Sequence, residues 1–157
     1  MGKDAGFDLE KAHRHFSANC FNRAWDYIDK TNRTPEEDQA MLLLGMASLW
    51  HWTQRPDCTP TNLSIGYWQV SRIYSLLGKS DPAREFGQLC LNVSQSEEIE
   101  PFYLGYACEA LARAEAVARD FAKAQEYIHL AHQASEKVSN VEDRQRLLAD
   151  LASISLT

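Results

Sequence analysis

The stretch YWQVSRIYSLLGKSDPA, residues 67–83, decides the fold, because it reads as a helix, a tight turn and the start of a second helix. Its apolar residues recur at the period of one buried helix face: Val70, Ile73, Tyr74 and Leu77. Gly78 readily adopts the left-handed conformation that ends many helices, and Pro82 suits the first turn of a new helix. Ala83 is small enough to let the paired helices approach closely.

A second stretch, CEALARAEAVARDFAKA at residues 108–124, has the same layout. Its turn point is Arg119, and Ala124 follows that point by the same interval that separates Ala83 from Gly78. Helical hairpins that recur in this way stack on their neighbours and form solenoids, which mostly bind other molecules. We therefore expect stacked helical hairpins.

The same helical periodicity continues through most of the chain and predicts an all-α protein of about seven helices. Residues 1–157 form one helical-repeat domain in this interpretation. Its segments are a disordered N-terminus at 1–7, a divergent first hairpin at 8–54, repeat hairpins at 61–95 and 101–138, and a capping helix at 140–155. A final helix of this kind covers the exposed apolar end of a solenoid.

The first hairpin contains a strong helix start and a clear apolar stripe. Thr34 and Glu37 have the spacing of a capping box, and Pro35 occupies the first helical position, which needs no amide donor. The stripe on the preceding helix predicts this buried face: Leu9, Ala12, Phe16, Cys20, Ala24 and Ile28.

The two repeat stretches resemble the tetratricopeptide-repeat family. The residues that carry this resemblance are Tyr67-Trp68, Tyr74, Leu77-Gly78 and Ala83 in one repeat, and Leu111, Asp120-Phe121 and Ala124 in the next. The resemblance covers about residues 63–138 and implies a short right-handed solenoid whose first helices line a concave binding surface. The turn points are 41 residues apart instead of the standard 34, and Gln95 replaces the consensus proline.

Taken whole, the chain also resembles a family of small bacterial proteins with tetratricopeptide-like helices and no assigned activity. The residues that carry this second resemblance are His51-Trp52, Asn62, the run 68–74, Leu77-Gly78 and the run 106–114. It implies the same fold and a bacterial origin.

Composition argues against several functional classes. The net charge is −6, so the basic stripe of a nucleic-acid binder is not expected. No apolar run approaches the roughly 18 residues of a membrane helix, and the first residues do not resemble a signal peptide. Three of the four cysteines lie among apolar neighbours, where free thiols act as small hydrophobes. We expect a cytoplasmic protein.

The histidines do not predict a metal site. His13 and His15 are two residues apart and point to different sides of a helix, while His129 and His132 could share an ion but lack a carboxylate at a helpful spacing. We expect no metal and no cofactor. His51 is different, because it lies beside Trp50 and Trp52, where it could serve as a general base in a pocket or pack as a helix-end residue.

The strongest candidate binding residues form a set on the first helices of the two repeat hairpins. Trp68 and Arg72 are four residues apart on one helix, and Glu109 and Arg113 are four apart on another. In the tetratricopeptide-like arrangement these positions line the concave face. An aromatic ring with two guanidinium groups suits a carboxylate or another anion. The alternative is a structural bridge in which Glu109 pairs with Arg113 or with Arg72.

Two functions follow from these residues. The first is a non-enzymatic module that binds a protein or peptide, or a second copy of itself as a homodimer, through Trp68, Arg72, Glu109 and Arg113. The alternative is a small-molecule-binding or catalytic helical domain with a pocket near His51, Trp52 and Trp68. An open groove favours the first, and a closed cavity with convergent polar groups favours the second.

Overall fold

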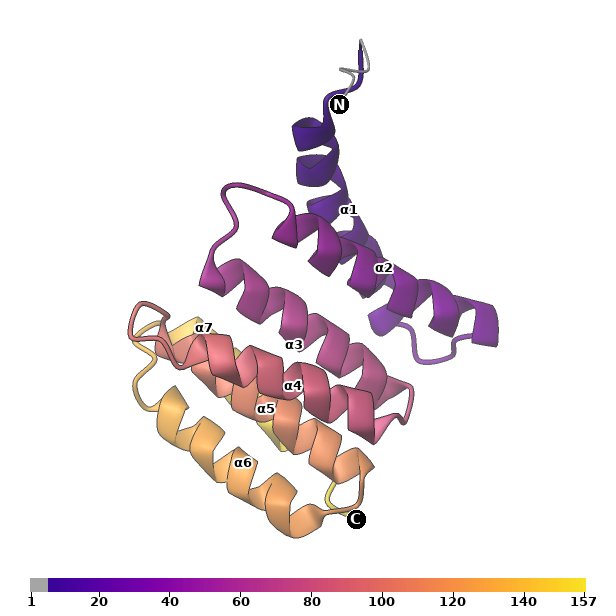
Figure 1. Ribbon diagram of the computed structural model, residues 1–157. Coiled ribbons are helices and arrows are strands. Elements are labelled where there is room, and N and C mark those ends of the chain that lie inside the picture. Colours follow the sequence, from indigo (N-terminus) through magenta and orange to yellow (C-terminus); the bar gives the residue numbers. More distant parts are fainter. Residues whose placement is uncertain (1–5) are drawn as a thin grey trace. The chain divides into compact units, whose positions relative to one another are not determined.

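The computed structural model describes residues 6–157, and this part of the chain contains helices and no strand. Figure 1 shows its seven helices. They are α1 (Leu9–Ile28), α2 (Pro35–Thr53), α3 (Pro60–Leu76), α4 (Ser80–Ser94), α5 (Pro101–Val117), α6 (Phe121–Ser135) and α7 (Val141–Ala152). The prediction of an all-α fold with seven helices is confirmed. The disorder predicted for residues 1–7 falls mainly on residues 1–5, which lie outside the described range.

The chain divides into two compact units, Met1–Cys58 and Thr59–Thr157. Helices α1 and α2 belong to the first unit, and α3 to α7 belong to the second. Within the units, neighbouring helices pack as α1 with α2, α3 with α4, and α5 with α6. Stacking of all hairpins into one domain over residues 1–157 stays a prediction.

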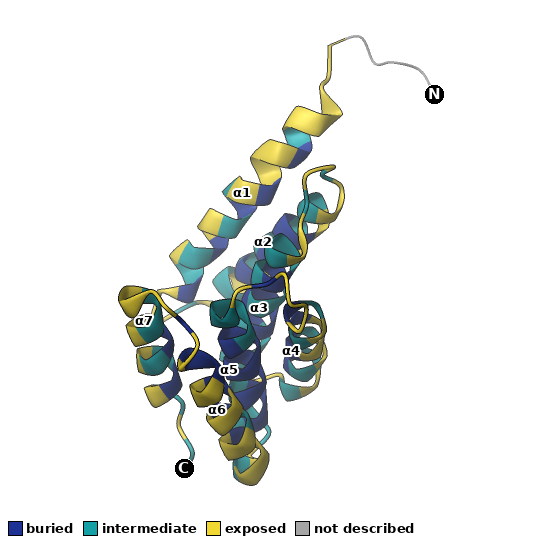
Figure 2. Cartoon of the chain, turned by 90° about the vertical axis from the view of Figure 1, so that its left-hand side faces the viewer, coloured by how far each residue is buried: buried dark blue, intermediate teal, exposed yellow. Residues whose placement is uncertain are grey.

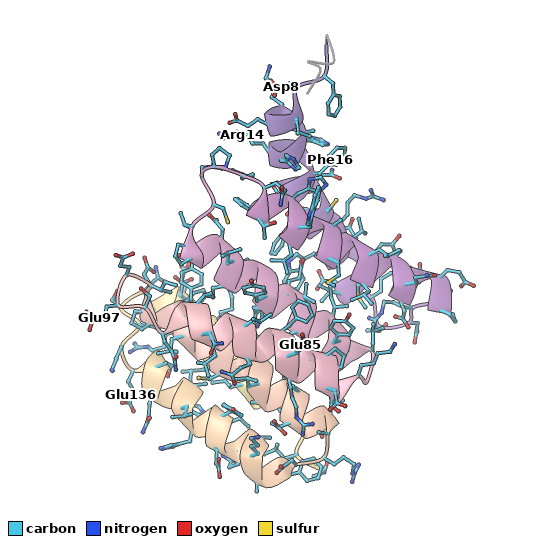
Figure 3. The ribbon with its side chains drawn as sticks, in the orientation of Figure 1. Asp8, Arg14, Phe16, Glu85, Glu97 and Glu136 are labelled. Carbon is cyan, nitrogen blue, oxygen red and sulfur yellow. The ribbon has the colours of Figure 1, made fainter. Side chains whose placement is uncertain are left out.

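In the first unit, the predicted apolar stripe of α1 is buried at Cys20, Ala24 and Ile28, but the N-terminal half of the helix buries an adjacent face instead. Leu9 and Phe16 were expected inside, but they are 61% and 42% exposed, and Figure 3 shows Phe16 on α1. His13 and Ser17 are buried instead. The reason is close approach, because the Ser48 hydroxyl on α2 donates to the Ser17 carbonyl at 2.7 Å. Bulky side chains do not fit at such a contact, so Phe16 lies beside it.

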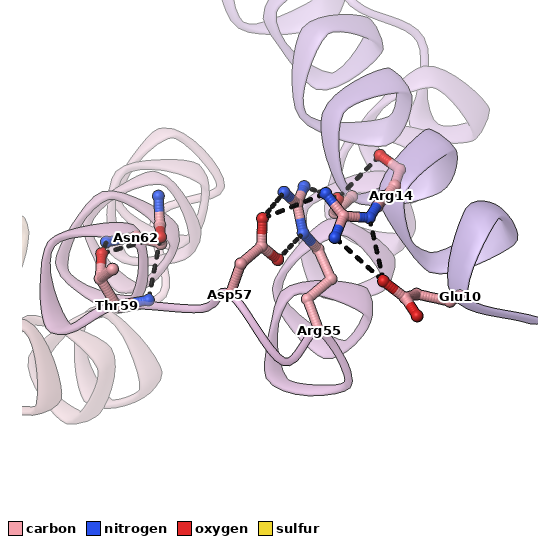
Figure 4. Close-up of polar contacts among 7 residues, drawn as sticks. Glu10, Arg14, Arg55, Asp57, Thr59 and Asn62 are labelled. Carbon is pink, nitrogen blue, oxygen red and sulfur yellow. Dashed lines mark hydrogen bonds and ion pairs between the residues drawn. The ribbon is translucent and has the colours of Figure 1, made fainter.

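Caps define where the helices begin. The predicted capping box of Thr34 and Glu37 is present at the start of α2. A second box, between Thr59 and Asn62, starts α3 at Pro60, one residue before the predicted boundary, and Figure 4 shows its contacts. The predicted 140–155 helix ends earlier, at Ala152.

The two repeat turns have the same geometry. Gly78 has φ 70° and Arg119 has φ 63°. In each turn the next amide reaches back to a carbonyl five residues earlier, from Lys79 to Tyr74 at 2.9 Å and from Asp120 to Glu115 at 3.0 Å. This hydrogen bond is typical of a helix end with a left-handed residue. The repeated turn is therefore confirmed. Arg119 is not a glycine, so its left-handed conformation costs roughly 1–2 kcal/mol.

In the second unit, α5 is the central helix. It packs against α3, α4, α6 and α7, and every residue from 105 to 112 is buried, as the dark ribbon in Figure 2 shows. Glycine on α4 serves this close packing, because a Cβ added at Gly87 would lie 2.9 Å from Cδ2 of Leu111 on α5. Leu147 and Leu151 of α7 are buried in the same core.

The two repeat alanines test the packing of the hairpins. Ala83 and Ala124 have no exposed surface. Replacement of either one by leucine should lower the free energy of unfolding by roughly 1–3 kcal/mol, because extra methylene groups push the paired helices apart. Ala122 lies on α6 two residues from Ala124 and is exposed, so Ala122→Leu should change stability by less than about 0.5 kcal/mol. Equal urea midpoints for Ala122→Leu and Ala124→Leu would contradict this packing.

Candidate functional site

The Glu109 carboxylate is buried in the middle of α5, where its residue is only 1% exposed. The Trp68 indole nitrogen on α3 donates to Glu109 Oε2 at 2.9 Å. The Arg113 Nε, one turn further along α5, donates to Glu109 Oε1. A buried carboxylate is tolerated only when it is paired and hydrogen-bonded, so these two donors stabilise its position.

Arg113 also ties α5 to the end of α7. Its Nη2 donates to the Asp150 carbonyl at 2.8 Å and to the Ser153 hydroxyl oxygen at 2.7 Å. Arg113 is therefore largely engaged inside the protein. Of the alternatives left open for Glu109, the pairing with Arg113 is the one that the structure contains.

Tyr106 extends this network on the turn of α5 that precedes Glu109. Its ring meets the Trp68 ring edge to face, with centroids 5.5 Å apart, and its hydroxyl donates to the Asp150 carboxylate at 2.6 Å. Burial, together with this hydrogen bond and the negative charge of Asp150, raises the pKa of Tyr106 far above its usual range. The phenol therefore stays protonated and holds α7 against α5.

Arg72 differs from the other three residues of the predicted set. It is partly buried on α3, and within residues 6–157 its guanidinium has no hydrogen bond and no ion pair within 4.0 Å. Burial lowers the pKa of Arg72, and the positive charge of Arg113 lowers it further. Arginine nevertheless stays charged at neutral pH, so Arg72 is a cation without a direct counter-charge in this part of the chain.

Arg72 and Arg113 both line one surface cleft of about 340 Å³, which we name the Arg72 cleft. It is lined by the C-terminal turns of α3 and α5 and by the segment 153–157 after α7. Ser75 lies three residues after Arg72 and also lines it, and its hydroxyl oxygen is buried without a hydrogen-bond partner among the described residues. No acidic residue is among the lining residues. The cleft therefore carries positive charge, and an unpaired hydroxyl group is buried beneath its wall.

Sequence reasoning missed several of these residues. Ser75 could have been found, because it is three residues from Arg72 and shares its helix face. Ser153 and Asp150 could not, since they reach the site only through the packing of α7. A second buried carboxylate, Glu115, was also missed, and it accepts from both Nε and Nη2 of Arg84 at 3.0 and 2.7 Å.

A larger cleft of about 590 Å³ lies between the segment 94–101 and helix α6 in the same unit. Its lining is mainly apolar: Leu91, Ile99, Pro101, Leu104, Leu130 and Ala134. Lys137 and Glu97 supply one charge of each sign there, and Figure 3 shows Glu97 on the α4–α5 loop. Opposite charges at the rim do not select a ligand class, so the Arg72 cleft is the better candidate site.

In the first unit, His51 forms an imidazole pair with His13. Their Nδ1 atoms are 2.8 Å apart, so one imidazole donates to the other. The Trp50 and Phe16 rings lie close to the His51 ring, with centroids 4.9 and 5.4 Å away. Burial lowers the pKa of His51, and repulsion from His13 adds to the effect. The structure thus favours neutral His51.

Trp52 lies against a charged cluster at the end of α2. The Arg55 guanidinium covers the Trp52 ring at 3.8 Å from its centroid. Figure 4 shows that Arg55 also contacts Asp57, and that Arg14 of α1 reaches the same carboxylate. The Arg55 hydrogen bond holds the pKa of Asp57 at about 2. This cluster fixes the end of α2 beside α1.

The predicted site residues are thus placed in two groups. The second unit brings Trp68, Glu109 and Arg113 into one hydrogen-bonded network and places Arg72 in the adjoining cleft. His51 and Trp52 belong to the first unit. The predicted pocket near His51 and Trp68 draws on residues of both units, and it stays a prediction.

Two further findings concern other functional classes. Among residues 6–157, no three or more His, Cys, Asp or Glu side chains are grouped so that they could hold a metal ion. None of the helices in this range combines the length and the apolar character that crossing a membrane requires. Comparisons with protein-family models, curated proteins and solved structures give no significant match.

The lowered pKa of His51 predicts how acid affects stability. An unfolded histidine binds a proton near its ordinary pKa of about 6.5, whereas folded His51 binds it only at lower pH. Between about pH 7 and pH 5 the unfolded state therefore binds more protons, and stability falls as the pH falls. Urea unfolding followed by tryptophan fluorescence reports mainly on the first unit, which contains Trp25, Trp50 and Trp52.

His51→Gln should reduce the pH dependence of the urea midpoint in this window. His15→Gln is the control, because His15 is exposed on the same α1 helix that carries His13. A midpoint that changes equally with pH in the wild type and in His51→Gln would show that the imidazole pair does not influence folding.

Proposed function

We propose that the chain is a non-enzymatic helical-repeat module that binds a protein or peptide partner through an anionic group received in the Arg72 cleft. The single observation that carries this proposal is the Arg72 guanidinium, which is partly buried yet has no hydrogen bond or ion pair among the described residues. Loss of hydration without pairing costs free energy. A bound anion would recover it through charge-assisted hydrogen bonds.

The partial negative charges at the nearby helix C-termini do not replace a bound anion as the partner of Arg72. Arg72 and Arg113 lie near the C-terminal ends of α3 and α5, where the helix dipoles place partial negative charge. Each such end corresponds to only about half an elementary charge, and its carbonyls are spread around the helix axis. A carboxylate or similar group would offer a full charge and directed acceptors.

The arrangement of the helices, the cellular location and the class of partner are part of the same proposal. The repeated left-handed turns at Gly78 and Arg119 support a tetratricopeptide-like, right-handed solenoid in which α3 and α5 line the binding face. We propose a cytoplasmic protein of bacterial origin, without a cofactor, whose partner is a peptide or protein, a second copy of the chain included, and not nucleic acid or a membrane.

A second candidate function is small-molecule binding or catalysis near His51. The observation that favours it is the lowered pKa of His51, which keeps the imidazole neutral near pH 7 and able to accept a proton. Its Nδ1 is engaged with His13, so Nε2 would be the reacting atom. The helical-repeat module remains the first choice, because the Arg72 cleft combines a volume of about 340 Å³ with a partly buried guanidinium that has no hydrogen bond or ion pair among the described residues.

The test uses Arg72→Ala with Arg23→Ala as a matched control, because Arg23 is exposed on α1, outside the second unit. Peptides selected from a displayed random library against the full chain should bind Arg72→Ala roughly 10- to 150-fold more weakly, the range expected for one charge-assisted contact. Binding to the wild type should also weaken as salt rises, because the cleft is open to water. Fluorescence anisotropy of the labelled peptides measures both effects.

Arg113→Ala is not a clean probe, since Arg113 holds Glu109 and the end of α7 and its loss should affect stability. The proposal is wrong if the selected peptides bind Arg72→Ala and Arg23→Ala equally well. A selection that enriches no peptide above background would also overturn it.

A further inference from the structure

We infer that the ligand of the Arg72 cleft is an aliphatic monocarboxylate, meaning one carboxylate group attached to a short branched or straight hydrocarbon. This inference rests on the proposed function of the same cleft and names the chemistry that the cleft selects. It follows from three properties of the lining residues: the hydrogen-bond donors, the net charge and the apolar wall.

The polar groups that face the cleft act mainly as donors. Arg72 offers a complete guanidinium, and Arg113 offers Nη1, since its Nε and Nη2 already bond to Glu109, the Asp150 carbonyl and Ser153. Ser75 also lines the cleft, and its hydroxyl oxygen is buried without a partner among the described residues. No Asp or Glu side chain is among the lining residues, so these donors favour an anionic ligand rather than a cation.

The charge balance favours a single negative charge. Glu109 neutralises Arg113, and Asp150 is close enough to act electrostatically on Arg72. At most one positive charge is therefore left for a ligand. A carboxylate would match it, whereas a phosphate dianion would add a second negative charge beside the buried Glu109, at a large cost in a poorly solvated site.

The remaining wall of the cleft is aliphatic. Leu76 comes from α3, Ala116 and Val117 come from α5, and Ile154 comes from the segment after α7. At about 340 Å³ the cleft is at the small end of ligand sites, which usually span roughly 300–1,000 Å³. The carboxylate therefore belongs to a small aliphatic group, such as a free short-chain acid or the last residue of a peptide.

The test is a calorimetric or NMR titration of the full chain with defined probes. N-acetyl-valine carries the carboxylate and an aliphatic side chain, N-acetyl-valinamide lacks the charge, N-acetyl-glycine lacks the side chain, and inorganic phosphate supplies a different anion. We expect N-acetyl-valine to bind best, and Arg72→Gln to weaken it on the order of 10-fold or more. Arg23→Gln should leave its affinity unchanged.

A fold check by circular dichroism accompanies each variant, and Val117→Thr gives a second, nearly isosteric probe. This change makes the wall more polar and should reduce the preference for N-acetyl-valine over N-acetyl-glycine. Isovalerate separates the two sources: tight binding of isovalerate indicates a free acid, and binding of N-acetyl-valine alone indicates a chain end. Either result supports the inference.

Three results would overturn it: equal binding of the amide and the acid, preferential binding of phosphate, or no binding of any carboxylate. Preferential phosphate binding that depends on Arg72 would leave the anion-binding role intact and reject only the monocarboxylate. If the library peptides lost affinity in Arg72→Ala while N-acetyl-valine did not bind, the proposed function would likewise stand without this ligand class.

Discussion

The burial of the Glu109 carboxylate is the constraint on which the second unit depends. Helix α5 is surrounded by four other helices, and a charge in the middle of such a helix must be paired where it stands. Trp68 and Arg113 supply the two donors. Because the Arg113 Nε is bonded to Glu109, its side chain is fixed in place. Its Nη2 can then also hold the end of α7 through hydrogen bonds to the Asp150 carbonyl and the Ser153 hydroxyl.

This pairing explains why the two arginines of the site differ. Arg72 on α3 and Arg113 on α5 each lie four residues before the end of the helix, and both line the Arg72 cleft. Only Arg113 has a carboxylate one turn earlier on its own helix. Arg72 has Trp68 at that position, and the Trp68 indole donates a hydrogen bond and accepts none. The asymmetry between a structural arginine and an available arginine therefore originates in one sequence difference, Glu109 against Trp68.

Local patterns predicted the helices and turns well because those features depend on neighbouring residues. The capping box of Thr34 and the left-handed turn at Gly78 are decided within a few residues. In the first half of α1 the choice of buried face is not decided locally, because it depends on how closely α2 approaches, whereas Cys20, Ala24 and Ile28 are buried as the stripe predicts. Leu9 and Phe16 have the spacing of a buried stripe, yet the smaller Ser17 occupies the contact with Ser48. Periodicity alone does not distinguish these two adjacent faces.

The site could be predicted only in part, for the same reason. Helical spacing related Trp68 to Arg72 and Glu109 to Arg113, but it did not decide which arginine would take the carboxylate. Ser153 and the aliphatic Ile154 reach the cleft from a segment about forty residues away, so only the packing of α7 places them there. Pairing of charges across elements is a tertiary property that no single-helix pattern contains.

Double-mutant cycles on unfolding free energies test the central claim most directly. One cycle combines Glu109→Gln with Arg113→Gln, and the other combines Glu109→Gln with Arg72→Gln. The structure predicts a coupling of about 1–3 kcal/mol between Glu109 and Arg113, and below about 0.5 kcal/mol between Glu109 and Arg72. A larger coupling of Glu109 to Arg72 than to Arg113 would contradict it, because Arg72 would then be the structural partner and would not be the cation available to a ligand.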